Sequence, residues 1–260
     1  GPYLTAGIVV AKYDHAAGAH LPAGVDVVEA GHPVPDEAGQ RGAEAIVRLL
    51  AEVTADDLVV VLISGGASAL LPLPVEGISL ADLQTLTDRL LRSGATIGEI
   101  NTIRKHLSQL KGKQLARLAA PAELLSLVLS DVVGDPLDVI ASGPTVPDTT
   151  TYAGAWDILQ RYGLLEETPE SIVQHLRQGM AGACAETPKP GDPLFMRVDT
   201  RIIGSNRLAA QAAVEEAVRL GYHALLLTTV VEGEAREVAR VAAGLARGIL
   251  THGDPLPPPA

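Results

Sequence analysis

The chain has 260 residues, of which 47% are hydrophobic and only 3% aromatic, so its core must be built from Ala, Val, Leu and Ile. The 31 acidic residues outnumber the 20 basic ones and give a net charge of −11, which excludes an overall basic nucleic-acid-binding surface. A single cysteine, Cys184, excludes an internal disulfide and a cysteine-based zinc site. It fits a reducing, cytoplasmic location. We find no apolar run long enough to cross a membrane and no signal peptide, so we expect no membrane partner.

Short apolar runs alternate with amphipathic stretches along the chain. Six runs predict strands, namely residues 7–11, 25–29, 58–63, 125–129, 201–203 and 224–228. The run 58–63 has no polar alternation, which is typical of a strand buried on both faces. Helical patterns lie between the strands, around residues 45–53, from Ser79 to Gly94 and over 208–220. The alternation predicts an α/β fold with a Rossmann-like, doubly wound, mostly parallel sheet.

A proline-rich segment, residues 187–193, indicates a domain boundary. We therefore expect a Rossmann-like domain over residues 1–190 and the start of a second α/β domain over 191–260. The second domain should supply a strand, a helix, a strand and a helix, with Glu232 where the last helix opens. It ends in a proline-rich linker, residues 252–259.

Ligands of doubly wound sheets bind beyond the carboxyl ends of the strands. The predicted strand 58–63 is followed by Ser64, Gly65, Gly66, Ala67 and Ser68. The glycines permit a tight turn and a close backbone approach to a ligand, while a helix start offers free N–H groups to an anion. Two interpretations of this loop are possible, namely a phosphate- or carboxylate-binding loop and a plain strand-to-helix turn with capping serines.

Two acids, Asp131 and Asp135, follow the strand predicted over 125–129, and Ser142 and Gly143 come shortly after. Magnesium prefers carboxylate and phosphate oxygens, so the two acids are candidate Mg²⁺ ligands. An Asx turn or helix cap is the alternative.

Asn101, Arg104 and Lys105 belong to a local cationic segment, residues 94–113, in an otherwise acidic chain. The segment could neutralise a polyanion such as a nucleoside triphosphate. The alternative is a solvated helix face.

Several familiar signatures are absent from the sequence. We find neither a Walker A loop nor a dinucleotide-binding glycine fingerprint, and Leu70 replaces the second glycine of a nucleophile elbow. His32, between a predicted strand and a helix, is a modest site candidate or a turn former. These features indicate an α/β enzyme that handles a small anion.

Six segments occur in a fixed order, namely GHPVPDEAG (31–39), ISGGASAL (63–70), RSGATI (92–97), EINTIRKHLS (99–108), LSDVVGD (129–135) and IASGPT (140–145). Together they resemble the glycerate 2-kinase family with a C-terminal MOFRL domain, which is also labelled hydroxypyruvate reductase-like. The resemblance covers nearly the whole chain. It implies ATP-dependent phosphorylation of D-glycerate at its 2-hydroxyl, giving 2-phosphoglycerate with Mg²⁺, in a cleft between two α/β domains.

We accordingly predict three kinds of site residue. The predicted catalytic residues are Arg104, Lys105 and Asp131, and the predicted metal ligands are Asp131 and Asp135. The predicted substrate- or nucleotide-binding residues are Ser64, Gly65, Gly66, Ser68, Asn101, Ser142, Gly143, Asn206 and Glu232.

The sequence departs from the family pattern in three places. The family's upstream Gly-Lys-Ala segment, whose lysine is thought catalytic, has no match, and the MOFRL domain is not found after Pro259. Ala67 stands where the family's loop has a third glycine. We therefore expect this chain to fold at least in part and to be inactive alone.

Three other functions remain open, namely a hydroxypyruvate reductase-type oxidoreductase, a serine hydrolase using Ser68 and a non-catalytic binding domain. The expected partner is a small molecule and not a nucleic acid, and a homo-oligomer is compatible with the sequence.

Overall fold

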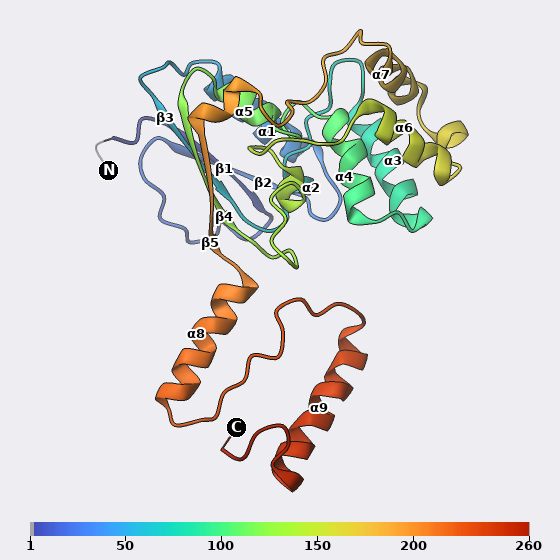
Figure 1. The fold of residues 1–260 in the computed structure, drawn as a ribbon. Helices are drawn as coiled ribbons and strands as arrows, with labels where there is room; N and C mark the ends of the chain where they lie inside the picture. The colour runs from blue at the N-terminus through green and yellow to red at the C-terminus, as the bar shows by residue number, and fades with distance from the viewer. Residues whose placement is uncertain (1–2, 260) are drawn as a thin grey trace. The chain divides into compact units, whose positions relative to one another are not determined.

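A computed structural model describes residues 3–259, and it has the α/β fold that the sequence predicts. The chain divides into two compact units (Figure 1). Unit 1 comprises residues 1–128 and 137–201, and unit 2 comprises residues 129–136 and 202–260.

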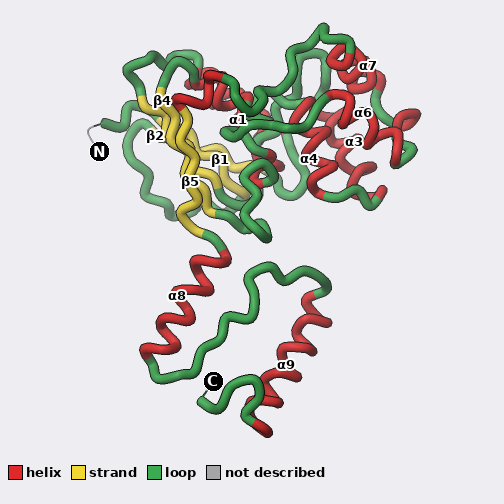
Figure 2. The backbone as a smooth tube through the Cα atoms, viewed as in Figure 1, coloured by secondary structure: helices red, strands yellow, loops and turns green. Residues whose placement is uncertain are grey.

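The strands, which are yellow in Figure 2, belong to two sheets, one of two strands and one of three. In the first, β1 (Gly7–Lys12) and β2 (Val25–Ala30) run parallel, with Gly7 opposite Val25. In the second, β3 (Leu58–Ile63) runs parallel to β4 (Glu123–Leu129), and β5 (Val198–Gly204) pairs with β4. Five of the six predicted strands are therefore confirmed. Within each parallel pair the carboxyl ends of the two strands lie side by side.

Helix α1 (Glu37–Leu50) contacts β1 and β2 and begins at Asp36, whose side chain accepts a hydrogen bond from the Gly39 N–H. A buried aliphatic cluster joins α1 to α5 (Gln114–Ala119), with Val59 and Val61 of β3 packed against it. This cluster covers one face of β3.

The other face of β3 is open in the part of the chain that the structure describes. Leu58, Val60 and Leu62 are 61%, 50% and 74% exposed. The prediction that β3 is buried on both faces is therefore wrong in the part of the chain that the structure describes. A run of apolar residues is compatible with a strand that helices cover on one face or on both, so the run alone does not decide between them.

A helical layer of unit 1 contains α3 (Leu80–Ser93), α4 (Ile97–His106), α6 (Tyr152–Arg161) and α7 (Glu170–Met180) (Figure 1). These helices share a buried core that includes Leu86, Ile103, Leu159 and Ile172. The predicted helix from Ser79 to Gly94 is confirmed, with a capping box at its start and a left-handed glycine at its end. A short helix, α2 (Ala67–Leu70), and three 3₁₀ turns, η1 (Ile140–Ser142), η2 (Leu165–Glu167) and η3 (Pro193–Arg197), complete this unit.

Unit 2 contains α8 (Asn206–Arg219) and α9 (Ala235–His252). The strand predicted over residues 224–228 does not form, and this segment has no regular secondary structure. A strand needs a hydrogen-bonded neighbour, and no strand among residues 3–259 pairs with it. No helix in the described part of the chain is both long and apolar enough to span a bilayer.

Candidate active site

The loop Ser64–Ser68 follows β3 at the carboxyl end of the parallel pair. Gly66 has φ +88°, a left-handed conformation that favours glycine. A Cβ atom at this position would lie 3.0 Å from Lys12 Cε and 3.1 Å from His32 Cδ2. The turn therefore favours glycine at position 66, and the missing side chain leaves room for Lys12 and His32 beside it.

Lys12 is the last residue of β1 and is half-buried beside this loop. Its ammonium group forms no hydrogen bond or ion pair with any residue in the range 3–259. Lys12 is not among the site residues predicted from the sequence, although a cation at the end of a predicted strand was a usable signal. An uncompensated cation beside a glycine turn suits an anionic ligand.

A chain of hydrogen bonds connects three of the predicted site residues. Ser68 Oγ lies 2.9 Å from Ser142 Oγ, and the Ser142 hydroxyl donates to Asn101 Oδ1 at 3.0 Å. Asn101 Nδ2 donates in turn to the Val139 carbonyl at 3.2 Å. The glycine loop, the middle of α4 and the turn η1 are thus held together.

The backbone around Ser142 is strained. Ala141, Ser142 and Gly143 have φ values of 53°, 61° and 60°, so two non-glycine residues adopt the left-handed region in succession. Such residues cost of order 1–3 kcal/mol each and cluster at functional sites. The carbonyls of Ser142 and Gly143 accept hydrogen bonds from the N–H groups of Gly112 and Lys113, which stabilise the turn.

Arg104 and Lys105 are neighbours on α4, but their surroundings differ. Lys105 is 3% exposed, and its ammonium lies 3.2 Å from Asp148 Oδ1 and 3.8 Å from Asp138 Oδ2. Burial raises the pKa of Asp148, but Lys105 and hydrogen bonds from Thr150 and Thr187 outweigh it and lower this pKa overall. The charge of Lys105 is therefore already compensated.

The remaining predicted site residues belong to unit 2. Asp131 is exposed and Asp135 is half-buried with φ +55° in the loop after β4. Neither carboxylate accepts a hydrogen bond from the described residues, so their oxygens are available to a ligand. Asn206 begins α8 and Glu232 precedes α9, and both are exposed. Nowhere in residues 3–259 do three or more His, Cys, Asp or Glu side chains group as a metal site.

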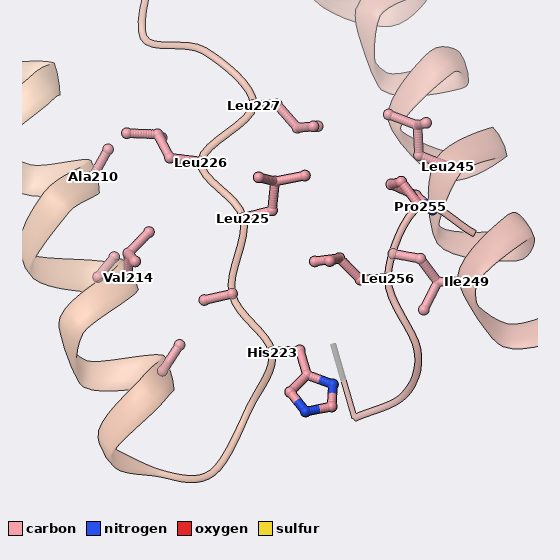
Figure 3. A pocket seen from close by; sticks show the side chains of 13 residues that line it. Ala210, Val214, His223, Leu225, Leu226, Leu227, Leu245, Ile249, Pro255 and Leu256 are labelled. Carbon is pink, nitrogen blue, oxygen red and sulfur yellow. The ribbon is translucent and has the colours of Figure 1, made fainter. Parts of the chain in front are cut away.

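An open groove of about 410 Å³ lies within unit 2 (Figure 3). Its walls are α8, α9 and the segment around Leu225–Leu227, and the side chains are almost all aliphatic. His223 is the one titratable residue among those lining it. The groove lacks the charged groups that phosphoryl transfer needs, so the polar cluster of unit 1 is the better candidate site.

Three comparisons relate this chain to known proteins. The family model DUF4147, a domain of unknown function, matches residues 2–177. A glycerate 2-kinase from Pyrococcus horikoshii is 44% identical over 253 residues, covering 97% of this chain and 56% of the relative. A putative hydroxypyruvate reductase from Agrobacterium vitis is 46% identical over 255 residues, covering 98% of this chain and 55% of the relative.

The fold has matches among solved structures. The crystal structure of a glycerate kinase from Thermotoga maritima superposes with a TM-score of 0.85 at 41% identity. The match covers 98% of this chain and 58% of that one. The chain thus spans a little more than half the length of these three proteins.

Proposed function

Because the chain belongs to the DUF4147 family and matches glycerate kinases along nearly all its length, we propose that its protein phosphorylates D-glycerate at the 2-hydroxyl with ATP, giving 2-phosphoglycerate. The observation that carries the proposal is the link from Ser68 to Ser142 and Asn101, beside the uncompensated Lys12. Most of the predicted site residues in unit 1 meet there. The proposal includes a cytoplasmic location, which the single cysteine supports.

The glycine loop and Lys12 are assigned to phosphate. Phosphoryl transfer depends mostly on positioning and on stabilising charge on the transferring group. Residues 64–68 present small side chains, so a phosphate oxygen can approach the backbone closely. The Lys12 ammonium beside Gly66 supplies a positive charge to the same place.

Asn101, Ser142 and Ser68 are assigned to orienting the acceptor. Their hydrogen bonds fix the direction of two hydroxyl groups and one amide, and the strained turn at Ser142 holds them in place. A polyhydroxy substrate can exchange hydrogen bonds with such groups. Lys105, paired with Asp148, is a positioning residue that keeps α4 against the loop containing Asp148.

Magnesium fits Asp131 and Asp135. Mg²⁺ is usually held by one or two carboxylates together with phosphates and waters, and these two side chains have free carboxylate oxygens. The ion would neutralise charge on the phosphates of ATP when bound. Asn206 and Glu232 stay proposed nucleotide- or substrate-binding residues.

The test is a coupled assay of the intact protein with ATP, Mg²⁺ and D-glycerate. Enolase added to the reaction consumes 2-phosphoglycerate directly, whereas 3-phosphoglycerate needs a mutase first. We expect enolase alone to report turnover. NADH oxidation with hydroxypyruvate in the absence of ATP would instead favour a reductase, the name carried by the Agrobacterium vitis relative.

A further inference from the structure

Arg104 is half-buried in the last turn of α4, one helical turn after Asn101. Residues three apart lie on the same helix face, so Arg104 shares the face that carries Asn101 to Ser142. Its guanidinium forms no hydrogen bond or ion pair with the residues that the structure describes. A half-buried guanidinium without a protein partner is available to an anionic ligand.

Lys111 provides a second cation at this place. Its side chain is 6% exposed, and its ammonium donates to the Leu71 carbonyl at 2.7 Å, directly after α2, the helix that contains Ser68. The turn that carries Lys111 is built by Ser108, whose hydroxyl accepts the Lys111 N–H at 3.2 Å. Lys111 forms no ion pair with any described residue.

The two cations therefore border the cluster of Ser68, Ser142 and Asn101 from two elements. Lys105, another cation of this segment, is neutralised by Asp148, but Arg104 and Lys111 have no acid of their own among the described residues. A carboxylate supplied by a ligand would satisfy both of them. The planar guanidinium fork of Arg104 matches the two oxygens of a carboxylate.

We propose that Arg104 and Lys111 form the subsite that binds the carboxylate of a small 2-hydroxy acid, with Asn101, Ser142 and Ser68 beside its hydroxyl groups. This inference rests on the proposed kinase function and assigns the substrate end of its site. It separates that end from the glycine loop and Lys12, which take phosphate.

The charge of the pair suits a monoanion. Burial, with a smaller contribution from the charge of Arg104, lowers the pKa of Lys111 to about 7. Arg104 therefore contributes a permanent charge, and Lys111 a second charge that is only partly present at neutral pH. A carboxylate between them would match that charge, whereas the phosphates of ATP carry more.

The test is calorimetric titration of the intact protein with D-glycerate in the presence of a non-hydrolysable ATP analogue. We expect Arg104→Gln and Lys111→Met each to weaken D-glycerate binding at least tenfold, and Arg104→Lys to restore part of the loss. The matched control is Arg92→Gln, an exposed arginine of α3 paired with Asp88, which should leave binding unchanged. Inorganic phosphate and glycerol, which lacks the carboxylate, are titrated in parallel.

The outcomes separate this inference from the proposed function. Loss of phosphate affinity with unchanged D-glycerate affinity would assign the pair to phosphate and overturn the inference. Unchanged D-glycerate affinity in Arg104→Gln, or no measurable D-glycerate binding by the unchanged protein, would also overturn it. Arg104-dependent binding of D-glycerate by a protein that fails the coupled assay would support the subsite and refute the kinase. Arg104 is only half-buried, so we expect its variants to fold. They test the inference even if Lys111→Met does not fold.

Discussion

Ser68 and Ser142 are 74 residues apart in the sequence, yet their hydroxyl oxygens lie 2.9 Å from each other. Ser68 belongs to the short helix after the glycine loop, and Ser142 occupies a left-handed position in a separate turn. The contact joins two segments that the sequence could only identify separately. It makes the loop after β3 part of one polar cluster with α4.

Lys12→Met removes the cation beside Gly66. We expect kcat to fall by tenfold or more, because each tenfold step corresponds to about 1.4 kcal/mol of lost transition-state stabilisation. Binding of D-glycerate should change little, since the carboxylate is assigned elsewhere. Steady-state kinetics with Lys12→Arg as the charge-preserving control measure this. An unchanged kcat in Lys12→Met would remove Lys12 from the site.

Asp131→Asn tests the proposed magnesium ligand. The amide keeps the size of the side chain but loses its charge, so we expect a higher Mg²⁺ concentration at half-maximal activity. The carboxylate is exposed, and thermal unfolding should therefore be unaffected. If the Mg²⁺ concentration at half-maximal activity is unchanged, Asp131 is not a magnesium ligand.

Asp148→Asn breaks the buried ion pair with Lys105. Removing one partner of such a pair typically costs about 3–5 kcal/mol, because the other charge stays buried without compensation. Urea unfolding measures the loss. Glu216→Gln, which breaks an exposed pair with Arg219, is the control and should have no measurable effect. Equal stability of the two variants would contradict a buried role for Asp148.

Gly179→Ala tests the packing of α7 on α6. A Cβ atom at Gly179 would overlap the ring of Tyr152, so we expect a loss of about 1–3 kcal/mol. Gly154→Ala is the matched control, because its Cβ would meet only Thr151 Oγ1 at 3.5 Å. That variant should be neutral or gain up to about 1 kcal/mol in the free energy of unfolding. A stable Gly179→Ala would mean that the two helices are further apart.

Lys111 should make stability dependent on pH. Its pKa is about 7 in the folded chain and near 10.5 when unfolded, so the unfolded chain binds more protons between these values. The free energy of unfolding should therefore rise as pH increases from 7 to 10, by about 1.4 kcal/mol per unit of pKa difference at most. The rise should be smaller in Lys111→Met. Urea unfolding at several pH values measures this. If the free energy of unfolding rises equally with pH in both proteins, Lys111 is exposed to water.

Local patterns allowed much of the fold to be predicted. The Ser79–Asp82 capping box and Gly94 bound a helix through contacts within a few residues, so the sequence displays them directly. The resemblance to glycerate 2-kinases is confirmed by relatives of that name.

Features that depend on tertiary neighbours could not be predicted. The segment 224–228 has strand-forming residues but lacks a partner strand, and the open face of β3 depends on which helices cover it. Lys105 has an ion-pair partner and Arg104 has none among the described residues, because folding brings Asp148, 43 residues away in the sequence, to Lys105. Lys12 belongs to the site because folding places its side chain beside Gly66, which is 54 residues away in the sequence.

Proton-coupled ³¹P NMR of the product formed from ATP and D-glycerate by the intact protein tests the central claim most directly. A phosphate on the C2 oxygen couples to a single methine proton, whereas one on the C3 oxygen couples to a methylene pair. We predict a doublet from 2-phosphoglycerate. A triplet, or no new phosphate ester, would contradict phosphorylation of D-glycerate at the 2-hydroxyl.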